Sequence, residues 1–256
     1  MRILVVGSGG LVGTALQARS AVHGCACVFL PRTACDVTDP AARDAALRLH
    51  RPDAIVFCAA RTVVDACEEG LASEAVNVDA PIAWAREVET WFLSSNFVFD
   101  GPGPHAPGAS PQPAGAYADQ KARAEAAVLE SGGHVARVGW VYGPGGRTFG
   151  STLAGRLRAG ERVRAVHDVV VQPTWSMDLA DALLRLPRGV THHAGAGEAS
   201  WYGFALAAWA RIGVGGVEPV RLAELGLRAP RPRDARLAPA TLPPWWARID
   251  ALVAAT

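Results

Sequence analysis

Short apolar runs alternate along the first 140 residues with longer segments in which apolar residues recur at helical spacing. The expected strands are Arg2–Val6, Ala26–Leu30, Asp53–Cys58, Thr90–Ser95 and His134–Val141. These runs are largely apolar and rich in β-branched residues, which is typical of strands buried on both faces of a parallel sheet. The expected helices are Thr14–Arg19, Ala41–His50, Leu71–Glu89 and Tyr117–Leu129. The alternation predicts an α/β fold with a doubly wound, Rossmann-type parallel sheet.

A glycine-rich loop links the first expected strand to the first expected helix. Gly7, Gly10 and Gly13 follow a GxxGxxG spacing. Such a loop needs glycine for its tight turn, for close approach of the backbone to a diphosphate, and for packing of the helix against the strand. A diphosphate bound there would lie at the N-terminus of the helix. An ordinary strand-to-helix turn could also contain two glycines, but this placement favours dinucleotide binding.

The residue that selects the cofactor is expected just after the second strand. An acidic side chain there would hold the ribose hydroxyl groups of NAD, whereas this chain has Arg32. Arginine suits a 2′-phosphate, so we predict NADPH as the cofactor, with NADH as the alternative. Asp36 could cover the adenine. Thr38 and Asp39 could do so too, although a cap for the following helix is the simpler interpretation.

The chain contains one lysine, Lys121, and one of its three tyrosines, Tyr117, lies four residues before it. Residues i and i+4 share a helix face, so the phenol and the ammonium group would face the same space. A nearby cation lowers the pKa of a phenol, which suits a proton donor near neutral pH. A solvent-exposed pair is the alternative. Ser94 and Ser95 end a strand, where hydroxyl groups either face the ligand crevice or form an ordinary turn.

Composition and charge narrow the class of protein. The 256 residues carry a formal net charge of +1, so we expect neither nucleic acid nor an anionic membrane as a partner. Five cysteines without CxxC spacing indicate reduced thiols. The chain opens on a strand pattern rather than a signal peptide, and we expect a cytoplasmic protein. His192 and His193 lack acidic or cysteine partners at metal spacing, so we expect no metal site.

Several motifs together resemble one family. They are the Gly7/Gly10/Gly13 loop, Asp36–Asp39, Cys58–Asp65, Asn77–Pro81, Ser94–Gly101, the Tyr117/Lys121 pair, Arg137–Gly143, Pro173-Thr174, Asp178–Ala180, His193–Tyr202 and Arg231-Pro232. On these residues the chain resembles the extended short-chain dehydrogenases/reductases, and more narrowly the dTDP-4-dehydrorhamnose reductase family of nucleotide-sugar ketoreductases. The glycine loop and the YxxxK spacing place only the superfamily, whereas the block at 193–202 is the most specific to the subfamily.

The resemblance implies roles for individual residues. Tyr117 would protonate the carbonyl oxygen as hydride arrives, Lys121 would hold the nicotinamide ribose and lower the pKa of Tyr117, and Ser95 would hydrogen-bond the same oxygen. The residues expected to bind the cofactor are Gly7, Gly10, Leu11, Val12, Gly13, Arg32, Asp36, Val37, Ala59, Ala60, Ser94 and Lys121. Those expected to bind the substrate are Asn96, Phe97, Trp140 and Arg231. Without the resemblance, Trp140 would be a core residue and Arg231 a surface residue.

The substrate side departs from the family's pattern at several positions. Asn96 and Phe97 stand where the family has Asp and Tyr, and Ala235 and Ala238 stand where it has Ser and Asp. The loop before Tyr117 lacks the usual acidic residues. The cofactor side keeps the family's residues. Reduction of a carbonyl is therefore a firmer prediction than any particular sugar.

Three functions remain open. The first is an NADPH-dependent reductase of a keto group on a nucleotide-activated deoxysugar, with a dTDP-sugar as the small-molecule substrate. The second is a non-catalytic NADP-binding subunit, because a regulatory subunit of methionine adenosyltransferase resembles the same family. The third is a reductase of a non-sugar ketone. The retained Tyr117, Lys121 and Ser95 favour an enzyme.

The resemblance also implies two domains. The NADP-binding Rossmann domain would comprise residues 1–142, rejoined by a strand and a helix near 163–190. A small C-terminal substrate-binding domain would comprise about 143–162 and 191–256, and the cleft would lie between them. Assembly as a homodimer is an open alternative to a monomer.

Overall fold

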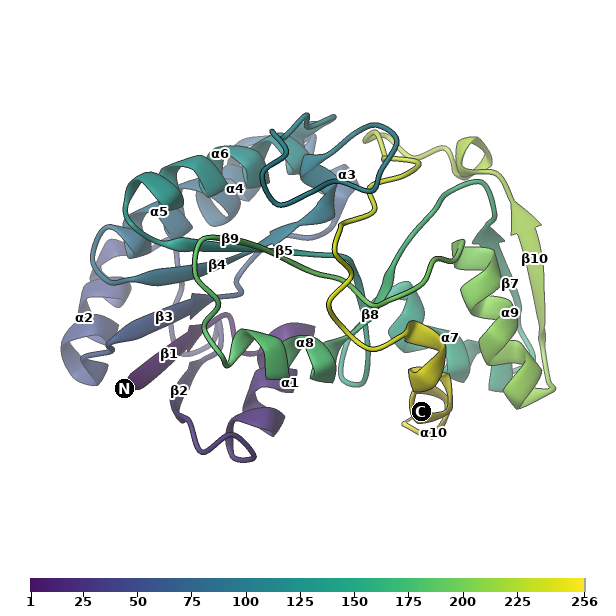
Figure 1. Cartoon of the computed structure of the whole chain (residues 1–256), viewed down its shortest axis with the longest axis horizontal. Coiled ribbons are helices and arrows are strands. Elements are labelled where there is room, and N and C mark those ends of the chain that lie inside the picture. The colour runs from purple at the N-terminus through teal and green to yellow at the C-terminus, as the bar shows by residue number, and fades with distance from the viewer. Residues whose placement is uncertain (256) are drawn as a thin grey trace.

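Six parallel strands form the main sheet of the computed structural model, which describes residues 1–255. In spatial order they are β2 (Ala26–Leu30), β1 (Arg2–Val6), β3 (Ala54–Phe57), β4 (Thr90–Ser95), β5 (His134–Val138) and β9 (Val190–His193). Every neighbouring pair is parallel. The strand order reverses between β1 and β3, and ligands of open α/β sheets bind beyond the carboxyl ends of the strands at such a point. The predicted doubly wound α/β fold is confirmed (Figure 1).

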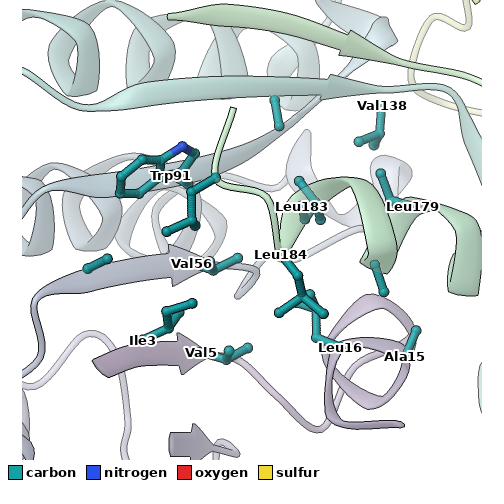
Figure 2. Packing of buried hydrophobic residues seen from close by; sticks show 14 of the residues in the cluster. Ile3, Val5, Ala15, Leu16, Val56, Trp91, Val138, Leu179, Leu183 and Leu184 are labelled. Carbon is teal, nitrogen blue, oxygen red and sulfur yellow. The ribbon is translucent and has the colours of Figure 1, made fainter. Parts of the chain in front are cut away.

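One face of the main sheet is covered by α1 (Leu11–Ser20) and α8 (Ser176–Leu183). Leu16 of α1 and Leu179 of α8 lie in one buried cluster with Val5 of β1 (Figure 2). Successive side chains of a strand point to opposite faces, so a strand covered on both faces must be apolar along its whole length. This requirement explains why the five expected strands could be found from apolar runs.

Three further helices cover the opposite face of the sheet. They are α2 (Pro40–His50), α5 (Ala80–Ala85) and α6 (Ala116–Glu130). Trp84 of α5 is fully buried and packs edge-on against Phe57 of β3, with 6.4 Å between ring centroids. Val128 of α6 lies in the same cluster as Phe92 of β4. The helix that carries Tyr117 and Lys121 is therefore packed against the sheet through a buried apolar cluster.

A smaller lobe is built on two sheets of two parallel strands each. The pairs are β6 (Trp140–Tyr142) with β8 (Pro173–Trp175), and β7 (Arg162–Val166) with β10 (Gly216–Val220). The helices of this lobe are α7 (Phe149–Arg158), α9 (Trp201–Ile212) and α10 (Ile249–Ala254). Its core contains the fully buried Leu153, Phe204 and Ile249. Figure 1 shows this lobe and α2 at opposite ends of the molecule.

Short helical segments complete the fold. They are α3 (Val64–Cys67), α4 (Leu71–Glu74), the π-helical η1 (Ala75–Asp79), and the 3-10 segments η2 (Asn96–Val98), η3 (Leu222–Leu225) and η4 (Trp245–Arg248). The single helix expected over Leu71–Glu89 is thus three segments, α4, η1 and α5. Pro81 has no N–H to donate to the carbonyl of Asn77, which disfavours the α-helical register just where the π-helical turn occurs.

Two expected strands are placed differently by the structure. The strand expected over His134–Val141 is interrupted at Gly139, where a Cβ would lie 2.7 Å from Thr174 Oγ1, and it continues as β6 in another sheet. The strand expected to rejoin the main sheet near residue 163 is β7, which pairs with β10 instead. Its exposed Arg162 and Arg164 do not suit a sheet buried on both faces. The sixth strand is β9, most of which was expected in the smaller domain.

Candidate active site

The glycine loop lies where the strand order of the main sheet reverses. Gly7 follows β1 with a φ of +83°, and a Cβ on it would lie 2.5 Å from the backbone nitrogen of Ala59, which follows β3. A Cβ on Gly13 would lie 2.4 Å from Ser8 Cα. Real Cβ atoms do not approach other atoms so closely, so these two positions require glycine. The loop and the end of β3 therefore form one tight cradle.

The N-terminus of α1 opens onto this cradle. Its N-cap residue is Gly10, and within residues 1–255 no side chain accepts a hydrogen bond from the first turn as a cap. The first turn also contains no acidic residue. Helix N-termini carry partial positive charge and free N–H groups, so the cradle fits the diphosphate of a dinucleotide. At the carboxyl end of β4, the Oγ of Ser94 is buried and has no hydrogen-bond partner in the described part of the chain.

The segment after β2 carries the residues expected to reach the adenosine. Arg32 is exposed. Oδ1 of Asp36 accepts hydrogen bonds from the backbone nitrogen and the Oγ1 of Thr38, at 3.0 and 2.8 Å. These bonds lower the pKa of Asp36, and the charge of Arg32 adds to the effect. Asp39 caps α2, which confirms the simpler interpretation for that residue. Val37 packs partly against the buried cluster that contains Trp84 and Phe92.

Tyr117 lies in the first turn of α6 beside the residues that follow β4. Its ring meets Phe97 edge-on, with 6.0 Å between centroids and 82° between planes. Burial raises the pKa of Tyr117 to about 12, and a hydrogen bond with the Ser95 side chain opposes that shift. The Ser95 hydroxyl also accepts a hydrogen bond from the backbone nitrogen of Phe97 at 3.2 Å. The structure thus brings the predicted phenol and hydroxyl groups together.

Lys121 lies one turn further along α6 and is 2% exposed. Its Nζ donates to the carbonyl oxygen of Leu93 at 2.8 Å and lies 4.2 Å from the centroid of the Phe92 ring. Burial lowers the pKa of Lys121 to about 8, and the charge of Glu125 opposes that shift. The expected lowering of the Tyr117 pKa by this lysine is not found: burial is the largest influence on the phenol, and the only opposing influence is the hydrogen bond with Ser95.

Asn77 of η1 connects the loop after β3 to the helix that carries the lysine. Its Oδ1 accepts a hydrogen bond from the backbone nitrogen of Arg61, and its Nδ2 donates to Oε1 of Gln120, both at 2.8 Å. Arg61 directly follows Ala60, and Gln120 directly precedes Lys121. One fully buried side chain thus fixes the loop after β3 relative to α6. The sequence assigns Asn77 no role, although a polar residue within an apolar helix is a usable signal.

A buried ion pair lies behind the lysine. Glu125 of α6 and Arg137 of β5 are 2% and 3% exposed, and Arg137 Nη2 lies 2.7 Å from Glu125 Oε2. Arg137 also donates to the carbonyl oxygen of Pro107 at 3.1 Å, which anchors the loop that precedes α6. The sequence alone gives this pair no role, although Tyr117, Lys121 and Glu125 recur at the spacing of one helix face.

The chain beyond residue 228 approaches the site from the other lobe. Nδ2 of Asn96 donates to the carbonyl oxygen of Ala235 at 3.1 Å, so two of the positions that depart from the family's pattern touch each other. Arg231 is not a free surface residue, because its Nη2 lies 3.1 Å from Oδ1 of Asp65. Its side chain is 12% exposed. Binding of a substrate phosphate by Arg231 therefore requires competition with Asp65.

These features agree with a comparison of the sequence against protein-family models. The model described as the RmlD substrate binding domain matches residues 1–243. This chain belongs to that family.

Relatives in sequence and a solved structure are similar to this chain over nearly its whole length. A probable dTDP-4,6-dihydroxy-2-methyloxan-3-one 4-ketoreductase of Streptomyces antibioticus is 35% identical over 250 residues, 91% of this chain and 85% of the relative. The dTDP-4-dehydrorhamnose reductase of Mycobacterium tuberculosis (strain ATCC 25618 / H37Rv) is 36% identical over 253 residues, with coverages of 90% and 82%. The crystal structure of dTDP-4-dehydrorhamnose reductase from Bacillus anthracis in complex with NADP has a TM-score of 0.92 at 24% identity, covering 100% and 99%. The resemblance read from the motifs is confirmed.

Trp140, expected at the sugar pocket of an RmlD-family protein, belongs to an aromatic cluster of the smaller lobe. It stacks on Trp201 and meets Phe204 edge-on, with ring centroids 5.9 and 5.1 Å away. It remains partly exposed. The packing agrees with the alternative of a core residue, and the exposed edge leaves contact with a sugar as a prediction.

The histidines of β9 and the cysteines of this family member show no arrangement for metal binding in the described part of the chain. His192 and His193 lie in β9, where burial lowers the pKa of each to about 4. All five cysteines are free thiols. Within residues 1–255, no group of three or more His, Cys, Asp or Glu side chains is arranged to hold a metal ion. No helix in that range is long and apolar enough to cross a membrane.

Proposed function

We propose that this protein is an NADPH-dependent reductase of a keto group on a nucleotide-activated deoxysugar, acting like a dTDP-4-dehydrorhamnose reductase. The observation that carries the proposal is the hydrogen bond between Tyr117 and Ser95, with Lys121 one helical turn further along α6 and bonded to Leu93 of the strand that ends in Ser95. The two relatives described above are named as reductases of dTDP-linked compounds. A dTDP-linked 4-keto-6-deoxyhexose is therefore the proposed substrate.

The proton for the reduction comes from this chain's own residues. A carbonyl oxygen placed between the phenol of Tyr117 and the hydroxyl of Ser95 accepts hydrogen bonds from both, and these bonds strengthen as negative charge develops. Bound NADPH would supply the hydride. Because the pKa of Tyr117 is raised to about 12, the phenol keeps its proton until the oxygen takes it. Lys121 is charged below its pKa of about 8 and would hold the nicotinamide ribose.

The cofactor would lie across the carboxyl ends of β1, β3 and β4. The cradle of Gly7, Gly10 and Gly13 with the N-terminus of α1 would hold the diphosphate, and Arg32 would hold the 2′-phosphate. Ala59 would let the backbone after β3 approach the cofactor closely. The proposed setting is the cytoplasm, with no nucleic acid or membrane partner, and assembly as a homodimer is left to measurement.

Oxidation of NADPH in the presence of a dTDP-4-keto-6-deoxyhexose tests this function. We expect turnover with the sugar and none with a panel of ketones that lack a nucleotide. NADH in parallel should be the poorer donor, because Arg32 offers a partner only to the 2′-phosphate. Turnover of the ketones alone would contradict the sugar assignment. Binding of NADPH without turnover of any ketone would favour the non-catalytic subunit.

A further inference from the structure

The loop between β6 and α7 lies against the helix whose N-terminus faces the glycine cradle. This loop comprises residues 143–148, with the sequence Gly-Pro-Gly-Gly-Arg-Thr. A Cβ on Gly146 would lie 3.1 Å from Leu11 Cδ1, and a Cβ on Gly145 would lie 3.5 Å from Thr14 Oγ1. Leu11 and Thr14 belong to the first turns of α1. The smaller lobe therefore reaches the rim of the proposed cofactor site through this loop.

The residue after Gly146 is an exposed arginine, Arg147. Across residues 1–255, no hydrogen bond or ion pair involves Arg147. The first turn of α1 offers it no acidic partner, since that turn contains none. The cradle itself, from Gly7 to Gly13, has no charged side chain. Arg147 thus directly follows a residue that lies against the first turn of α1, where an anion in the cradle would bind.

A second arginine lies at a different edge of the same loop. Arg32 follows Pro31, and a Cβ on Gly9 would lie 3.7 Å from Pro31 Cβ. Arg32 therefore approaches the cradle from the β2 side, whereas Arg147 approaches it from the α1 side. The two cations suit the two separate phosphate groups of NADPH, the 2′-phosphate and the diphosphate.

We propose that Arg147 binds the diphosphate of NADPH and so joins the smaller lobe to the bound cofactor. The inference rests on the proposed use of NADPH. Guanidinium groups form paired, charge-assisted hydrogen bonds to phosphate oxygens, and the fork geometry of arginine suits them better than a lysine ammonium. A contact of this kind to a charged group corresponds to about a tenfold change in affinity or more. Because Arg147 is exposed, added salt weakens the contact.

Binding measurements on the full chain test the proposal without any turnover. NADPH, ADP and 2′-AMP are titrated against the wild type, Arg147→Ala and Arg147→Lys. ADP carries a diphosphate and no 2′-phosphate, whereas 2′-AMP carries the reverse. We expect Arg147→Ala to weaken NADPH and ADP about tenfold and to leave 2′-AMP within about twofold, with Arg147→Lys between. Arg32→Ala should give the opposite pattern, weakening 2′-AMP and sparing ADP.

Arg164→Ala is the matched control, because Arg164 is an exposed arginine on β7 in the same lobe. It should leave all three affinities unchanged. Unchanged NADPH and ADP affinities in Arg147→Ala would overturn the proposal. So would weakening of dTDP alone, titrated in parallel as a fourth ligand, because the arginine would then serve the substrate. Failure of the wild type to bind NADPH would overturn the proposed function first, whereas binding without turnover leaves the role of Arg147 standing.

Discussion

Tyr117 and Lys121 are both buried on one face of α6, with 8% and 2% of their surfaces exposed. Burial favours the neutral form of each group, so the pKa of the phenol rises and that of the amine falls. The sequence spacing predicts the pair and its shared face correctly. It does not reveal how deeply that face is buried, because depth depends on Phe97 and on strand β4, which fold against the helix from elsewhere in the chain.

Lys121→Met should change how stability depends on pH. The pKa of Lys121 is about 8 in the folded protein, whereas the reference value for an unfolded chain is 10.5. Between these two pH values the unfolded chain binds more protons than the folded protein. The lysine therefore makes the wild type more stable as pH rises from about 8 to 10.5. We expect the stability of the variant relative to wild type to fall by about 2 kcal/mol from about pH 7.5 to about pH 9.5. Urea unfolding of both proteins without cofactor measures this, and a difference independent of pH would contradict it.

At the scale of elements, local apolar patterns predict the positions of β1 to β5 but not the contacts between helices. The apolar run at Arg2–Val6 and the glycines after it predict both β1 and the turn into α1. The π-helical turn before Pro81 is not visible in an apolar pattern, because it depends on one missing N–H. The join between η1 and α6 through Asn77 and Gln120 links segments distant in sequence, and no local pattern encodes it.

Asn77→Ala should loosen the loop after β3 and α6 together. The backbone N–H of Arg61 and the amide of Gln120 would lose their buried partner, at a cost of about 2 to 4 kcal/mol in the free energy of unfolding. The affinity for NADPH should fall with it. Asp79→Ala is the control, since Asp79 is exposed in the same π-helical turn. Chemical unfolding and NADPH titration of both variants measure the effect, and equal behaviour of the two would contradict the role of Asn77.

The ion pair of Glu125 and Arg137 should be more costly to break than to replace. Arg137→Met leaves the Glu125 carboxylate buried without a partner, which should lower the free energy of unfolding by about 3 to 5 kcal/mol. The double variant Glu125→Leu with Arg137→Met should recover most of that loss, because neither member of the pair is then left as an unpartnered buried charge. A double-mutant cycle by urea unfolding measures this. A double variant less stable than Arg137→Met would show that the unpaired Glu125 carboxylate is not the main cause of the lost stability.

At the scale of the whole molecule, the site is completed by contacts between distant parts of the chain. Asp65 follows β3, yet it binds Arg231 and accepts a hydrogen bond from the backbone nitrogen of Ala229 at 2.9 Å. Asn96 likewise reaches Ala235. The sequence predicts two lobes and the residues on each side, but partners separated so far along the chain have no shared pattern. The same reason explains why β9, and not β7 as expected, is the sixth strand of the main sheet: strand pairing joins segments far apart in the chain.

Asp65→Asn should ease substrate binding if Arg231 serves the substrate diphosphate. The variant keeps an acceptor for Ala229 and removes the charge that competes for Arg231. The pair is partly exposed, so we expect a two- to fivefold lower KM for the dTDP-sugar, about 1 kcal/mol or less, with kcat unchanged. Glu69→Gln, which breaks the nearby exposed pair with Arg228, is the control. Steady-state kinetics decide the matter, and an unchanged KM in Asp65→Asn would remove Arg231 from the substrate site.

The most direct test of the account concerns the proton that Tyr117 delivers. Single-turnover reduction of a dTDP-4-keto-6-deoxyhexose is measured for the wild type and Tyr117→Phe, together with the Kd for NADPH. Phenylalanine keeps the ring that packs against Phe97 and removes only the proton donor. We predict a rate about 10² to 10⁴ lower in the variant, with NADPH bound as in the wild type. A variant that reduces the sugar at the wild-type rate would contradict the mechanism.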